Sequence, residues 1–385
     1  MSRAVTADHV LFDECIEAFR QADIRQAPVI DGKASSYLLT SFELPELWQL
    51  PHCTIHPSVR VQLPGAMSAF ICRVENPDSA GRHNSHLYGI ALASIASFTT
   101  GRVCKSTRDG YLCDRPALRN DEILQLALLH PVLVAGPGCV HTTLSSARRE
   151  EYKTAISSLF AKLHSVPYKT YVILMQAIRL VHLSLLNKRD DFGLAYLLLV
   201  SAIESVAQHA VKRDSVRKTH PAEAAWKLKA GKDPAFAELL AAYRDLRGKD
   251  QYIQERYIEF INAFAPAKIW EEIVFPPLQD MADYIKEVCP SHDLTHVVRR
   301  HWHEKYPTDL PAKQIREILA DSYTHRSCFI HSGRQPPHRE PISLNRFFQE
   351  IREFDGRNII ERLLPNYELL LGIAQRSICA WADSK

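Results

Sequence analysis

Residues 315–333, IREILADSYTHRSCFIHSG, decide how the second half of this chain is interpreted. Apolar or small residues recur along the stretch with the three- and four-residue spacing of one helix face, at Ile315, Leu319, Ser322 and Phe329. Arg326 falls on the same face, so the pattern predicts a helix that turns an arginine toward the protein interior. Ser332 and Gly333 end this helix, because glycine readily adopts the left-handed conformation of a C-cap.

A second unusual position is Glu204, which lies in residues 194–211, a segment that is apolar around most of its circumference. Burying a lone carboxylate costs on the order of several kcal/mol, so Glu204 must be paired or hydrogen-bonded. Arg326 is the partner that we expect. The pair then has two interpretations, a structural tie between two core helices or an active-site contact that orients the arginine.

A boundary between two domains is expected near residue 145, after the GPG at residues 136–138. Residues 1–145 have mixed patterns, with short strand-like runs at 36–42, 59–63 and 68–74 and helical runs at 86–99 and 121–129. We therefore expect an α+β N-terminal domain, which senses or binds a partner. Ser145 is expected to cap the helix that follows.

Residues 146–385 are dominated by helical periodicity, and prolines fall between the periodic runs, where a missing backbone N–H does least harm. The sequence predicts an all-α helical bundle here. Its helices are expected at 156–163, 171–187, 192–212, 222–229, 238–246, 253–264, 278–288, 312–330 and 358–381.

Composition excludes several classes of protein. Hydrophobic residues make up 46% and charged residues 24%, which is typical of a globular protein, and the net charge of +3 is compatible with a polyanionic ligand without indicating one. The nine cysteines are scattered and form no CxxC pair, so a reducing, cytoplasmic location is expected. The two longest apolar runs are interrupted by polar residues, so core helices are expected and not membrane spans.

Arg326, His331 and Ser327 together suit metal-free cleavage of RNA, and we expect neither a metal nor another cofactor. The arginine can hold a phosphate through two N–H donors and stabilise charge that develops on it. The histidine titrates near neutral pH, so it can take the proton of the ribose 2′-OH or protonate the leaving 5′ oxygen. On an ideal helix the two residues lie about 140° apart. Loosening of the last turn is expected to swing the ring of His331 toward Arg326.

The segment YTHRSCFIHSG, residues 323–333, resembles the Tyr-x-x-Arg-Ser-x-x-x-His-x-Gly signature of HEPN domains, particularly the Apea-like branch. Residues 195–208, AYLLLVSAIESVAQ, are similar to the first long helix of that group. The resemblance covers about residues 170–385. It implies a HEPN-like helical bundle, frequently a homodimer in which motif residues of two protomers face one groove.

Many members of the family are metal-independent endoribonucleases in toxin or antiviral defence systems, whereas others have lost activity and act as scaffolds or bind nucleotides. The resemblance implies catalytic roles for Arg326 and His331, supported by Ser327 and Glu204. We expect Tyr323, Arg299 and Arg300 to contact the RNA substrate. The N-terminal domain is then expected to recognise a phage or protein trigger.

Overall fold

The protein is described from a computed structural model. The structure describes residues 8–20, 35–63, 68–77, 85–113, 118–132, 142–216, 219–249, 251–274, 279–293, 304–333, 345–355 and 358–385.

The N-terminal part contains an antiparallel sheet with the order β2-β3-β5-β1-β6, and β4 also pairs with β5. The strand-like runs predicted at 36–42, 59–63 and 68–74 are confirmed, as are both predicted helices. The strands are β1 Ser35–Thr40, β2 Trp48–Gln49, β3 Thr54–Ile55, β4 Val59–Gln62, β5 Ser68–Glu75 and β6 Cys104–Ser106. The helices of this part are α1 Asp8–Arg20, α2 Ser85–Thr100, α3 Gly110–Cys113 and α4 Asn120–Leu129.

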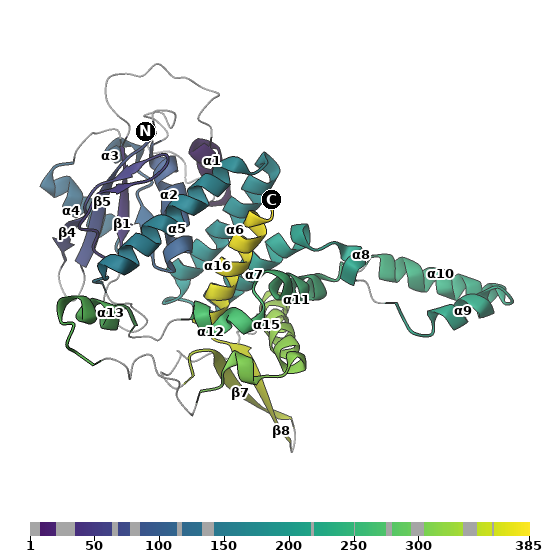
Figure 1. The fold of residues 1–385 in the computed structure, drawn as a ribbon. Helices are drawn as coiled ribbons and strands as arrows, with labels where there is room; N and C mark the ends of the chain where they lie inside the picture. The colour runs from purple at the N-terminus through teal and green to yellow at the C-terminus, as the bar shows by residue number, and fades with distance from the viewer. Residues whose placement is uncertain are drawn as a thin grey trace.

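Helix α2 packs against β1 and β6, and Gly89 permits the close approach. A Cβ atom at Gly89 would lie 2.5 Å from Ser106 Oγ and 2.9 Å from Ser36 Cβ. Any larger residue would therefore push the helix away from the sheet. The other side of α2 contacts α1, α5 (Ser146–Ser165) and α6 (Tyr168–Asn187), so this helix lies between the sheet and the helical part of the molecule (Figure 1).

The second part is mostly helical, as predicted, and its centre is the packed pair of α6 and α7 (Phe192–Ala210). Both helices are long and apolar enough to cross a membrane, but more than half of each is buried inside the protein, as expected for core helices. The remaining helices are α8 Arg213–Val216, α9 Glu223–Ala230, α10 Pro234–Lys249, α11 Ile253–Phe264, η3 Ala267–Ile269, α12 Trp270–Ile273, α13 Gln279–Val288, η4 Pro307–Asp309, α15 Ala312–Ser332 and α16 Tyr367–Asp383.

The all-α prediction is wrong at one place, because residues 358–365 form a strand and not the start of a helix. Strand β8 (Asn358–Pro365) pairs antiparallel with β7 (Phe348–Asp355) in a hairpin beside α15 (Figure 1). The isoleucines and leucines of β8 have helix-like spacing, which misled the prediction. Pro365 disfavours the helical conformation for the residue before it, so α16 begins only after the proline.

Residues on both sides of position 145 share one hydrophobic core, which runs from Phe12 to Ala382. A buried histidine also joins the two sides, since His182 Nε2 donates to the carbonyl of Cys104 at 2.8 Å and its Nδ1 lies 2.7 Å from Ser94 Oγ. Ser145 caps α5 as predicted, accepting the N–H of Arg148 at 3.2 Å. The division at residue 145 stays a prediction.

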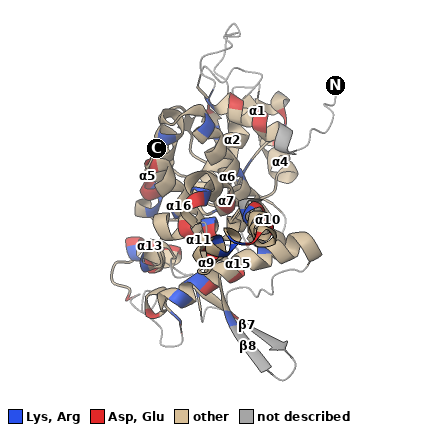
Figure 2. Ribbon diagram, turned by 90° about the vertical axis from the view of Figure 1, so that its right-hand side faces the viewer, with Lys and Arg blue, Asp and Glu red and all other residues tan. Residues whose placement is uncertain are grey.

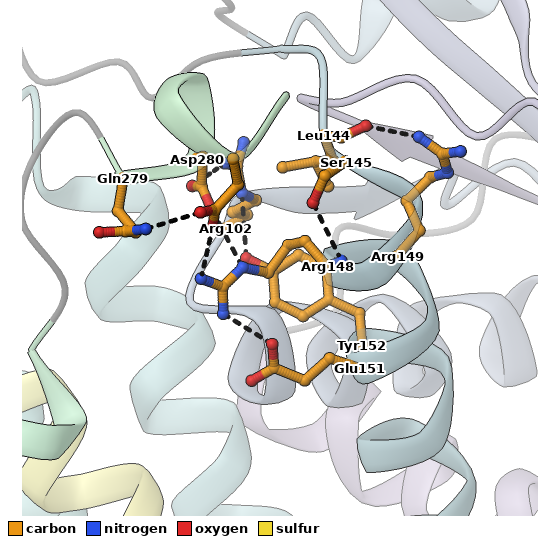
Figure 3. Close-up of polar contacts among 10 residues, drawn as sticks. Arg102, Leu144, Ser145, Arg148, Arg149, Glu151, Tyr152, Gln279 and Asp280 are labelled. Carbon is orange, nitrogen blue, oxygen red and sulfur yellow. Dashed lines mark hydrogen bonds and ion pairs between the residues drawn. The ribbon is translucent and has the colours of Figure 1, made fainter. Parts of the chain in front are cut away.

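Helix α13 is attached to this core by charged groups at the N-terminal end of α5 (Figure 3). Arg102 and Arg148, whose side chains are 2% and 8% exposed, both contact Asp280, at 2.5 Å and 3.2 Å. Arg148 also pairs with Glu151 at 2.7 Å and Asp283 at 3.5 Å. Two buried positive charges are thus neutralised by three carboxylates, two of which belong to α13.

Candidate functional site

The candidate site lies where α7, α11 and α15 meet, since each of these helices contacts the other two. The apolar stripe predicted on α15 is directed inward at Ile315, Leu319 and Ser322, which are buried. Gln254 of α11 fixes the approach of α15 by donating from Nε2 to the carbonyl of Ala320 at 3.0 Å. Helices α7 and α11 thus hold α15 against the core.

The predicted pairing of Glu204 with Arg326 is confirmed. Arg326 Nη2 lies 3.1 Å from Glu204 Oε2, and the side chains are 20% and 9% exposed. Gln208, one turn after Glu204 on α7, donates from Nε2 to Glu204 Oε1 at 3.1 Å. The carboxylate therefore meets a charge on one oxygen and an amide on the other, which offsets much of the cost of its burial.

The guanidinium of Arg326 lies next to a pair of packed tyrosine rings, Tyr323 and Tyr257. The guanidinium carbon of Arg326 lies 5.7 Å from the centroid of Tyr323, within range of a cation–π contact. Tyr323 in turn packs against Tyr257 of α11 at 5.6 Å, and the hydroxyl of Tyr257 lies 3.1 Å from Ser322 Oγ. Tyr323, which was expected to contact the substrate, therefore lies beside Arg326, but its contacts described here are with the protein.

Burial governs the titration of this cluster. Burial raises the pKa of Glu204, and the attraction of Arg326 and the hydrogen bond from Gln208 oppose that rise without cancelling it. The pKa of Tyr323 is also raised, first by burial and then by the negative charge of Glu204. The site therefore disfavours added negative charge on its own side chains, while Arg326 provides a fixed positive charge.

His331 does not turn toward Arg326 in the way expected from the sequence. Helix α15 stays helical through Ser332 and ends at Gly333, whose φ is 66° and whose N–H donates to the carbonyl of Phe329. The last turn is therefore not loosened, and regular geometry keeps the two residues about 140° apart around the axis. His331 is exposed, whereas Ser327 is half-buried.

Two supporting residues, Tyr257 and Gln208, were not predicted from the sequence. Gln208 follows Glu204 by four residues, so i, i+4 spacing was a signal available for it. Tyr257 belongs to the apolar face of α11 and looks like an ordinary core residue. Arg299 and Arg300, the predicted substrate-binding pair, lie outside the described residues.

A cavity of about 420 Å³ lies beside α15, between this helix and the β7–β8 hairpin. Its lining is largely charged and includes Lys305, Glu317, Asp321 and Arg362. Arg326 and His331 are not among the described residues that line it. Figure 2 shows Lys and Arg positions next to Asp and Glu positions along α11 and α15, so these helices carry charges of both signs.

Comparison of the chain with protein-family models, with curated proteins and with solved structures found no match.

Proposed function

We propose that the protein is a metal-independent endoribonuclease of HEPN type, which cleaves RNA through attack of the ribose 2′-OH. The observation that carries the proposal is a guanidinium held in place by Glu204 on the same helix end as an exposed imidazole. Metal-free cleavage of RNA can use a fixed positive charge to bind the phosphate and an imidazole as a general acid or base.

In the proposed reaction Arg326 binds the scissile phosphate. An arginine has five N–H donors. Because Nη2 contacts Glu204 and Nε is buried, the Nη1 donors of Arg326 are the ones that we expect to bind phosphate oxygens. His331 removes the proton of the 2′-OH, the 2′ oxygen bonds to phosphorus, and the bond to the 5′ oxygen breaks. The leaving 5′ oxygen takes a proton from water, and the RNA end carries a 2′,3′-cyclic phosphate.

The separation of Arg326 and His331 makes the assembly of protomers part of this proposal. In a homodimer whose motif helices face one groove, Arg326 of one protomer and the partner's His331 act on the same phosphodiester. Ser327 then supports the imidazole or the ligand by a hydrogen bond. An N-terminal domain that recognises a phage or protein trigger would restrict cleavage to infected or stressed cells.

Cleavage of single-stranded RNA in EDTA tests the proposal. Arg326→Ala and His331→Ala are expected to abolish cutting by the purified protein, because each removes one of the two reacting groups. Arg316→Ala on α15, where the side chain is 43% exposed, and His209→Ala at an exposed position of α7 are matched controls and should retain activity. Wild-type protein that leaves every RNA intact, or equal cutting by all four variants, contradicts the proposal.

The alternative is a catalytically inactive HEPN-like module that binds RNA or a nucleotide, or serves as a scaffold. The regular helix between Arg326 and His331 favours this alternative, because it does not bring the pair together within one chain. An RNA-binding module predicts RNA retention that Arg326→Ala and His331→Ala leave unchanged, with no cleavage. A scaffold predicts no RNA retention at all.

A further inference from the structure

Helices α9 and α10 form a hairpin, here called the arm, that projects from the body of the molecule (Figure 1). The arm is inserted between α7 and α11, two of the three helices at the candidate site. Its inner face is already occupied. Trp226 packs edge-on against Tyr243 at 5.4 Å, Leu240 is buried, and Glu223 pairs with Arg244 and Arg247.

The outer faces of the arm carry the three most exposed large hydrophobic side chains of the described residues. Leu228 of α9 is 75% exposed, and Leu239 and Leu246 of α10 are 63% and 68% exposed. A single exposed leucine needs no explanation, but three on one projecting hairpin mark a surface that another chain covers.

The spacing of these leucines identifies a helix as the partner. On α10, Leu239, Ala242 and Leu246 are three and four residues apart, and all three are exposed. This is the spacing of a seam that packs against another helix. Ala224, Ala225 and Leu228 provide an exposed surface of small residues and one leucine on α9.

The charged residues that border the exposed leucines differ in sign between α9 and α10. Lys227 and Lys229 flank Leu228 and give the outer face of α9 a positive border, and the ammonium of Lys229 also lies 6.0 Å from the ring centroid of Phe236 on α10. On α10, Glu238 precedes Leu239 and Asp245 precedes Leu246, so the seam has a negative border. The two outer faces of one arm are therefore complementary in charge to each other. They cannot meet within one hairpin, because they point away from its shared inner face.

We infer that the arm associates with the arm of a second copy of this chain, with α9 of each copy packed on α10 of the other. A two-fold axis creates both contacts at once, since the same surface is used by both copies. Each contact places a positively bordered leucine against a negatively bordered seam. This interface is the contact that holds the two copies together. It does not involve Arg326 or His331 and does not rest on the proposed nuclease activity.

Charge reversal tests the inference on the full-length protein. Lys227→Glu/Lys229→Glu makes both outer faces negative, and Glu238→Lys/Asp245→Lys makes both positive. Each double variant alone should dimerise at least about tenfold more weakly than wild type in sedimentation velocity. Mixed in equal amounts, the two variants should recover a dimer, because each α9 then faces an α10 of opposite charge.

Recovery on mixing separates recognition from a folding defect, which mixing cannot repair. Leu239→Asp/Leu246→Asp should also abolish the dimer, whereas Leu128→Asp on α4, at an exposed leucine outside the arm, should leave it intact. Wild-type protein that stays monomeric at about 100 μM overturns the inference. So does a mixture of the charge-reversed variants that associates no better than either one alone.

Discussion

Two of the ion-pair clusters among the described residues, one at the start of α5 and one beside α7, differ in how carboxylates meet the charge of a shielded guanidinium. At the start of α5, Arg102 and Arg148 are almost fully buried, and Asp280 contacts both of them. Beside α7, Arg326 keeps 20% of its side chain exposed and meets Glu204. The first group is a closed network with carboxylates on several sides, and the second is a single pair with an accessible flank.

The difference separates two uses of a buried arginine. A closed network has little capacity left for a ligand, and removing one partner strands the remaining charges, so its main effect is on stability. A single pair holds the guanidinium in one orientation while leaving donors free, which suits binding of an anion. Perturbing the two places should therefore affect different properties, stability in the first and RNA chemistry in the second.

The largest effect is expected from Asp280→Asn, which leaves Arg102 and Arg148 without their shared carboxylate. The free energy of unfolding should fall by about 2–3 kcal/mol, a value at the low end for breaking a buried pair because Asp280 is 25% exposed. Urea denaturation measures it. Glu151→Gln, at a carboxylate that is 58% exposed, should cost no more than about 0.5 kcal/mol. Equal losses in the two variants would show that α13 is not attached through Asp280.

A smaller loss of stability, about 1 kcal/mol, is expected from Glu204→Gln, because the amide keeps the size of the side chain and removes only the charge that faces Arg326. Its effect on chemistry should be larger. If Glu204 orients the arginine, RNA cleavage falls at least about tenfold while RNA binding is retained. Glu259→Gln, at the exposed carboxylate that pairs with Arg316, is the control and should change neither property. Unchanged cleavage by Glu204→Gln would make the pair purely structural.

Sequence patterns located most of the longer helices, the strands β1, β4 and β5, and the Glu204–Arg326 pair, because each depends on local periodicity or on the cost of burying one charge. A carboxylate within an apolar helix must find a cation, and Arg326 was the inward-directed candidate. The same reasoning could not find the network around Asp280. Arg102 and Asp280 are 178 residues apart, and neither lies in an apolar segment that would reveal its burial.

The β7–β8 hairpin was missed for a related reason. Strand pairing is decided by the partner strand, whereas the spacing of apolar residues within β8 is compatible with a helix. His331 was predicted to turn toward Arg326 through a loosened helix end, but Gly333 caps a regular helix instead. Chemical motifs identify residue types at a spacing, and the backbone between them decides whether the side chains meet.

The smallest expected effect is a pH dependence of the free energy of unfolding. It shows whether burial or the attraction of Arg326 has the greater influence on the pKa of Glu204. Burial raises the pKa of Glu204 in the folded protein above its value in the unfolded chain. Its contribution to stability is then fully present below the unfolded pKa and is lost as the pH rises through the folded pKa. The difference in unfolding free energy between wild type and Glu204→Gln should therefore grow in favour of wild type as the pH falls from about 8 to about 4. A difference that shrinks on acidification would mean that attraction to Arg326 outweighs burial, and the site would then resemble the closed network at Asp280.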